Sequence, residues 1–163
     1  MQLLIEEYSR GYEMLRESIK GLSEEEIRFK PGKDKWSIHQ VIIHITDSEL
    51  VSTYRLKKVL SEPEPLLTST DQDAWANSLN YEQLDREQYF LLFKLLRTSM
   101  LPILLNLTTE QLERGGVYAD AGRFTFKELL EYRIQHIRGH LNQIEKLKKS
   151  FGSAMSKDYF NPK

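Results

Sequence analysis

The chain has 163 residues, of which 40% are hydrophobic and 10% aromatic, a size that suits one globular domain with a single core. Its 23 Lys and Arg against 24 Asp and Glu leave a net charge of -1, so no global positive field is available to hold a nucleic acid. The chain has no cysteine, which excludes disulfides, thiolate metal ligands and a cysteine nucleophile, so any metal must be bound by His, Asp or Glu.

The N-terminal segment carries Glu6 and Glu7, two acids that come too early for a signal peptide. We find no apolar run that approaches the length needed to cross a bilayer. We therefore expect a cytoplasmic protein without a membrane partner. Residues 1–21 place apolar side chains at steps of three and four, which predicts an amphipathic helix that ends at Gly21.

Two further helices are predicted from caps and apolar spacing. Ser37 and Gln40 form a capping-box pattern at the start of the second helix, which we expect to run to about Leu60. The third helix begins near Asp85 and is expected to bend near Pro102, which lacks a backbone donor. The low polarity of this helix indicates burial on several sides.

Residues 61–84, between the second and third helices, contain prolines, scattered acids and no sustained period, so we predict a loop with at most one short turn. A loop of this length in a compact domain is more often functional than idle. Asp71, Asp73 and Trp75 lie in it and are candidates to overhang a site on the bundle. Trp75 fits the role of an apolar anchor for the loop equally well.

The fourth helix falls within residues 124–150, where Thr125 and Glu128 form its N-terminal cap. The tail, residues 151–163, is predicted to be frayed or dependent on a partner. Strand signals are weak throughout. The predicted fold class is therefore all-α, with one four-helix-bundle domain over residues 1–150 and long connections between the helices.

An internal echo relates the two halves of the chain. "LSEEEI" at Leu22 is matched by "LTTEQL" at Leu107, and "WSIHQVIIH", which ends at His44, is matched by "FTFKELLEY", which ends at Tyr132. His136 lies one turn beyond Tyr132. The echo therefore predicts that His44 and His136 lie at a similar depth in the bundle.

Three of the four histidines have the spacing of a metal site. His136 and His140 are four residues apart and share one helix face, with Cβ atoms roughly 6 Å apart. His44 occupies a core-facing step of the second helix. Three neutral imidazoles from two facing helices leave an open coordination position, as in catalytic zinc sites. His39 points about 140° away from His44 and is expected at a surface or interface. The competing interpretation is three hydrogen-bonded core histidines without a metal.

Two acids follow the first of these histidines closely. Asp47 and Glu49 could orient an imidazole or assist proton transfer, and they are the candidate catalytic residues. A solvated polar helix face is an equally good interpretation of each.

The segments "WSIHQVIIHITDSE", "DQDAW" and "HIRGHLNQI" together resemble the DinB-like superfamily, most closely its YfiT branch of metal-dependent hydrolases and bacillithiol transferases. The resemblance spans roughly residues 5–150. It implies a four-helix bundle with atypical connectivity, a homodimer, and a divalent metal ion, zinc or nickel, held by three histidines. Matched by motif, those ligands are His44, His136 and His140.

The resemblance leaves the activity open. The expected function is that of a metal-dependent enzyme, either a transferase that joins a small bacillithiol-like thiol to an electrophilic substrate or a hydrolase. The alternative is a non-catalytic metal-binding interaction domain, in which Asp47 or Glu49 would close the coordination sphere as a fourth ligand.

Overall fold

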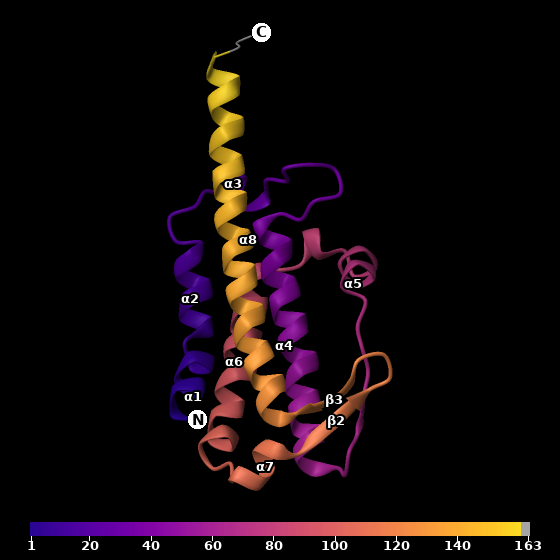
Figure 1. Ribbon diagram of the computed structural model, residues 1–163. Helices are drawn as coiled ribbons and strands as arrows, with labels where there is room; N and C mark the ends of the chain where they lie inside the picture. The colour runs from indigo at the N-terminus through magenta and orange to yellow at the C-terminus, as the bar shows by residue number, and fades with distance from the viewer. Residues whose placement is uncertain (161–163) are drawn as a thin grey trace.

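The structure, a computed structural model, describes residues 1–160 and the side chains of residues 1–156. Its long helices form a bundle of four columns (Figure 1). The elements of these columns are α1 (Gln2–Ser9) with α2 (Gly11–Ser18), α4 (Ile38–Ser61), α6 (Arg86–Leu105) and α8 (Phe126–Phe160). Helix α4 packs against both α6 and α8, and α1 and α2 pack against the same two helices. The predicted four-helix bundle is therefore confirmed.

The predicted caps explain where the long helices begin. Ser37 and Gln40 form a complete capping box at the start of α4. Thr125 and Glu128 exchange hydrogen bonds at the start of α8. Two short helices, α3 (Glu24–Arg28) and α7 (Thr109–Glu113), also begin with capping boxes. Because α3 and α7 come from the echoed segments, each echoed segment forms a short helix that precedes a long one, although β2 (Gly115–Tyr118) and β3 (Gly122–Thr125) stand between α7 and α8.

The first column differs from its prediction as one helix, because it is interrupted at Arg10. Gly11 follows the interruption, and a Cβ atom at this position would collide with the guanidinium of Arg97 on α6. A larger residue here would therefore require the buried Arg97 side chain to shift. Gly21 ends the segment with φ of +78°, a left-handed conformation that favours glycine.

A small sheet beside the bundle was not predicted. Strand β1 (Leu66–Leu67) pairs in parallel with β2 (Gly115–Tyr118), which pairs antiparallel with β3 (Gly122–Thr125). These strands are too short to show an alternating pattern, and β2 opens with two glycines. Gly116 lies where a Cβ atom would come within 2.8 Å of the Leu67 side chain, so the glycine lets β1 approach.

The 61–84 segment is more ordered than the loop that we predicted. Besides β1 it contains α5 (Gln72–Ser78) and the 3-10 helix η1 (Tyr81–Gln83). Asp71 caps α5 by accepting hydrogen bonds from two backbone N–H groups. The short helix carries too few residues to establish a helical period, which is why its sequence resembles a loop.

Helix α8 also extends beyond its prediction. Residues 151–160 continue the helix, where the sequence predicted a tail that is frayed or dependent on a partner (Figure 1). The ring of Phe151 packs edge-on against Phe29, with 5.4 Å between ring centroids. Residues 161–163 of the predicted tail lie outside the described residues.

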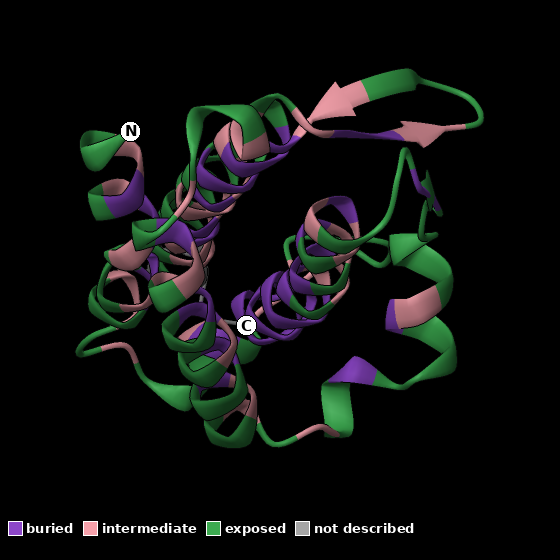
Figure 2. Ribbon diagram, turned by 90° about the horizontal axis from the view of Figure 1, so that it is seen from below, coloured by how far each residue is buried: buried purple, intermediate pink, exposed green. Residues whose placement is uncertain are grey.

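The buried faces of the helices turn toward one another (Figure 2). They form two main apolar clusters at different levels of the bundle, one containing Leu56 and Met100 and the other Ile42 and Phe93. Between these levels lies a set of buried polar residues contributed by all four columns: Tyr8, Glu49, Arg97 and Arg133.

Helix α6 is less buried than its apolar sequence indicated. Leu91, Leu92 and Leu95 are exposed, and only 28% of the most apolar 18-residue stretch of the helix is buried. By length and composition alone, this helix is long and apolar enough to cross a membrane. The prediction that no apolar run approaches that length is therefore wrong. In the bundle, α6 packs along α4 and carries the buried Arg97. The absence of a membrane partner stays a prediction.

Candidate metal centre

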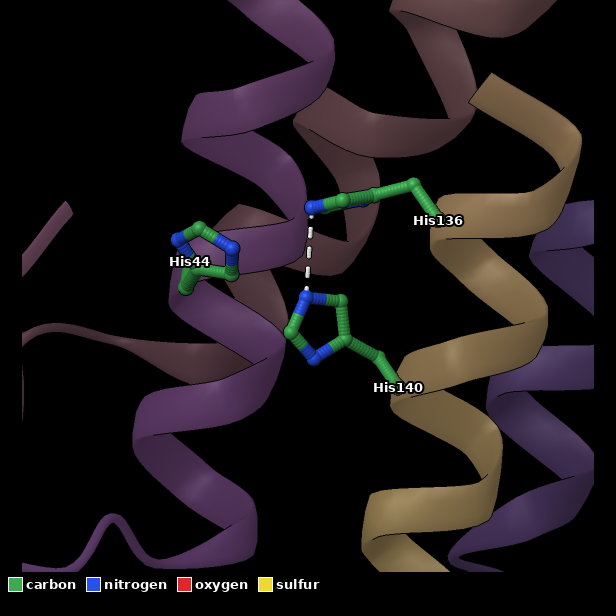
Figure 3. Close-up of side chains that lie close together, drawn as sticks. All are labelled: His44, His136 and His140. Carbon is green, nitrogen blue, oxygen red and sulfur yellow. Dashed lines mark hydrogen bonds between the residues drawn. The ribbon is translucent and has the colours of Figure 1, made fainter. Parts of the chain in front are cut away.

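The three predicted histidines lie together in the structure. His44 projects from α4 toward His136 and His140 on α8 (Figure 3). The ring centroids are 5.3 Å apart for His44 and His136, 4.8 Å for His44 and His140, and 4.5 Å for His136 and His140. One nitrogen from each ring can be chosen so that all three lie within 4.8 Å of one another. This is the arrangement that the echo and the spacing predicted.

Neighbouring side chains hold two of the rings. The Nδ1 of His140 lies 2.8 Å from Oε1 of Gln143, and in the tautomer in which Nδ1 donates to this oxygen, Nε2 keeps its lone pair. This Nε2 faces Nε2 of His136 at 3.2 Å (Figure 3). The indole of Trp36 covers the His44 ring, with 5.0 Å between centroids.

The electrostatic environment keeps these rings neutral. Burial, the nearby imidazoles and the positive charge of Arg133 lower the pKa of His44 to about 3 and that of His136 to about 2. Burial is also the main cause that lowers the pKa of His140. Since metals bind the neutral imidazole, the ligand form is present at neutral pH without displacement of a proton from the ring nitrogens.

The donor set fits a divalent metal ion. Nε2 of His44 and Nδ1 of His136 are buried and have no hydrogen-bond partner within the described part of the chain. An unpartnered buried polar atom is costly, and a bound metal would satisfy Nε2 of His44. Three imidazoles leave a coordination position open, as in catalytic sites. The identity of the ligands stays a prediction, and the chemistry of the cluster supports it.

Asp47 lies close to the histidine cluster and is hydrogen-bonded. It lines a small cavity together with His44, Trp75 and Tyr81. The Tyr81 hydroxyl donates a 2.6 Å hydrogen bond to Oδ2 of Asp47. Burial raises the pKa of the Asp47 carboxyl, and this hydrogen bond opposes the rise. Trp75 packs in the apolar cluster with Ile43 beside this cavity, so it has both of the roles considered for it.

Glu49 occupies the bundle centre. Its side chain is 0% exposed and forms ion pairs of 3.2 Å with Arg97 and with Arg133. It also accepts a 2.6 Å hydrogen bond from the hydroxyl of Tyr8. The two guanidiniums hold the pKa of Glu49 below its usual range although burial raises it. Its catalytic role stays a prediction, whereas its contacts show that it positions Arg133.

His39 is separate from the cluster, as predicted, but it is not a surface residue. It is 1% exposed, and its Nε2 lies 3.0 Å from the carbonyl oxygen of Tyr81. The 61–84 segment folds back over α4 and covers this ring. Because the sequence predicted a loop for that segment, the burial of His39 could not be predicted from it.

A cavity of about 520 Å³ adjoins the histidines. His44 and His136 lie in its wall together with Ser48, Arg55 and Arg133, which the sequence argument did not select. Their spacing in the sequence could have indicated them. Ser48 and Arg55 follow His44 by 4 and 11 residues, and Arg133 precedes His136 by 3. Residues at these spacings lie on the same helix faces as the histidines.

Comparisons with known proteins agree with this description. The model of the DinB superfamily matches residues 7–144. A relative from Halalkalibacterium halodurans, named "Putative metal-dependent hydrolase BH0277", is 28% identical over 89% of this chain and 84% of its own length. "Putative metal-dependent hydrolase YfiT" from Bacillus subtilis is 24% identical over 85% of this chain and 78% of its own length.

Two solved structures share the fold. YfiT from Bacillus subtilis, described as a probable metal-dependent hydrolase with an unusual four-helix bundle topology, superposes with a TM-score of 0.85 at 22% identity, covering 93% of this chain and 87% of that one. A DinB-like protein of the same organism, YjoA, superposes with a TM-score of 0.59 at 19% identity, covering 92% of each chain. At these identities the likeness shows the fold alone.

Proposed function

This chain belongs to the DinB superfamily, and from that premise we propose that it is a metal-dependent enzyme that activates a small nucleophile for attack on a small-molecule electrophile. The observation that carries the proposal is the cluster of three histidines, two of which, His44 and His136, lie in the wall of a cavity of about 520 Å³. A cavity of this size is in the range that binds small molecules. The names of its relatives support metal dependence.

Each residue of the site would have a separate role in the reaction. His44, His136 and His140 would hold the ion, and the hydrogen bond from His140 to Gln143 would fix one donor atom. A bound divalent ion would supply Lewis acidity that lowers the pKa of a water or thiol nucleophile. Asp47 would accept the proton that the nucleophile loses, because it lies beside His44 and because burial raises the pKa of its carboxyl, which makes it a stronger base.

The nucleophile determines the class of reaction. With water the protein would be a hydrolase, in line with the names of its relatives. With a low-molecular-weight thiol such as bacillithiol it would be an S-transferase, which the resemblance to the YfiT branch supports. Zinc and nickel are both suited to three imidazole ligands.

The first test measures metal content per chain by mass spectrometry after incubation with zinc or nickel and removal of excess ion. We expect about one equivalent for the wild type and a loss in His44→Ala. His39→Ala is the matched control, because it removes an imidazole of α4 that lies outside the cluster, and it should keep the metal. Circular dichroism confirms that each variant folds. A wild type that binds neither ion would refute the proposal.

The second test separates the two reactions. The metal-loaded protein is incubated with p-nitrophenyl acetate alone, and with monochlorobimane in the presence and absence of bacillithiol. Conjugation that requires both thiol and metal identifies a transferase, whereas ester cleavage without thiol identifies a hydrolase. Metal binding with neither activity, together with strong destabilisation when the metal is removed, would instead identify a non-catalytic metal-binding domain.

A further inference from the structure

The cavity beside the histidines has a cationic wall that metal binding alone does not require. Arg55 from α4 and Arg133 from α8 both line it, on the same helices that supply the histidines. The two arginines differ in their partners.

Arg133 belongs to a buried group with an unbalanced charge. Its Nη2 pairs with Glu49 at 3.2 Å and its Nη1 donates to Ser48 at 2.9 Å. The same carboxylate also pairs with Arg97, so two guanidiniums share one negative charge. Tyr8 adds no compensating charge, because burial and the adjacent Glu49 raise the pKa of its hydroxyl. One positive charge therefore remains uncompensated behind the cavity wall.

Arg55 has no carboxylate partner among the described side chains. Its guanidinium lies over the ring of Tyr118, with 5.3 Å to the centroid, and its Nη2 donates to the backbone carbonyl of Thr68. The Nε atoms of Arg55 and Arg133 are both buried without a hydrogen-bond partner in the described part of the structure. These two Nε atoms are closed off from the cavity, but both arginines line it, and a guanidinium is well matched to carboxylate or phosphate oxygens.

The cavity also contains acids, but these lie toward solvent. Asp120 and Glu128 are exposed, and Glu131 is half-buried and faces Lys127 at 3.9 Å. Water screens charges at such positions, so the buried Arg133 dominates the field in the interior. Phe124 and Leu129 line the cavity as well and offer an apolar surface for a carbon skeleton.

We propose that this cavity binds a small organic anion, a carboxylate or a phosphate ester with an apolar portion, whose charged end contacts Arg55 and Arg133. The proposal deepens the proposed function by naming a substrate class: since the cavity also reaches His44 and His136, the remainder of the ligand would extend to the metal centre. The anion site itself does not depend on the ion.

The test is isothermal titration calorimetry on the full chain, both zinc-loaded and metal-free, with three probes that share a phenyl group. They are 3-phenylpropionate, its uncharged amide 3-phenylpropionamide, and phenyl phosphate. Binding of an anion to the metal-free protein, at least tenfold tighter than that of the amide, supports the proposal. The tighter anion of the two distinguishes a carboxylate from a phosphate ligand. Equal affinity for acid and amide, or no binding of either anion, would overturn it.

Two variants of α4 assign the effect to the cavity. Arg55→Gln should weaken anion binding at least tenfold, whereas Lys57→Gln removes the same charge from an exposed position on the same helix and should leave it unchanged. Equal effects of the two variants would contradict a specific site. Metal content is measured in parallel and should stay at the wild-type value in Arg55→Gln, so that failure of the anion site and failure of the metal centre are told apart.

Discussion

The variant Glu49→Gln tests the buried charge group at the centre of the bundle. The carboxylate is fully buried, its two ion pairs measure 3.2 Å, and the Arg97 and Arg133 side chains are each 3% exposed. The neutral amide would leave two buried guanidiniums without a counter-charge. Removing one partner of a buried ion pair typically costs about 3–5 kcal/mol, a large share of the roughly 5–15 kcal/mol that stabilises a domain.

Urea denaturation of the metal-free protein at pH 7 measures this loss. Since the pKa of Glu49 is lowered in the fold, its contribution is fully present at pH 7 and is lost only as the pH falls below the unfolded-state value near 4.5. Glu145→Gln is the control, because it breaks an exposed pair with Lys148 and should cost less than about 0.5 kcal/mol. A loss below about 1 kcal/mol in Glu49→Gln would show that the guanidiniums find other partners and would refute the reasoning.

Two further predictions concern ionisation near the candidate centre. The fold lowers the pKa of His44 to about 3 and that of His136 to about 2. Below pH 6.5 the unfolded chain therefore binds more protons than the folded protein. The free energy of unfolding of the metal-free protein should fall by about 1.4 kcal/mol per pH unit for each of these histidines as the pH falls from 6.5 toward 4. Urea titrations at several pH values check this, and a constant stability over that range would contradict it. Tyr81→Phe removes the hydrogen bond that favours ionised Asp47, so the pKa of Asp47 should rise further in a carbon-detected NMR titration; an unchanged or lower value would show that the bond does not control it.

The sequence was sufficient to predict the parts of the fold that depend on local chemistry. Ser37 and Thr125 begin α4 and α8 because their side chains cap free backbone N–H groups, and this requirement is visible in a few residues. The histidine cluster follows from the same helices, since His136 and His140 share a face wherever a helix forms. The placement of His44 opposite them was predicted from its core-facing step on the second helix and from the internal echo, and the structure brings the three rings together.

Contacts between distant segments could not be predicted in this way. The polar face that contains Glu49 has an ordinary helical spacing, and only the packing of four columns shows that two arginines converge on it. His39 was misplaced for the same reason, because its cover comes from a segment about forty residues away in the chain. The short strands could not be predicted for a further reason. Strand β2 depends on its pairing with β1 and β3 and on the small size of Gly116, and neither produces a periodic pattern in the sequence.

The position of Arg133 connects the stability of this bundle to its proposed chemistry. A cation binds less well beside a fixed positive charge, and the positive charge of Arg133 reaches all three histidines, where it lowers each pKa. Neither folding nor metal binding alone benefits from an uncompensated guanidinium at this place. An anion in the adjoining cavity would balance both the guanidinium and a bound metal ion. A charge that opposes both folding and metal binding would then contribute to ligand binding, which is the electrostatic pattern expected of a site built for an anionic ligand.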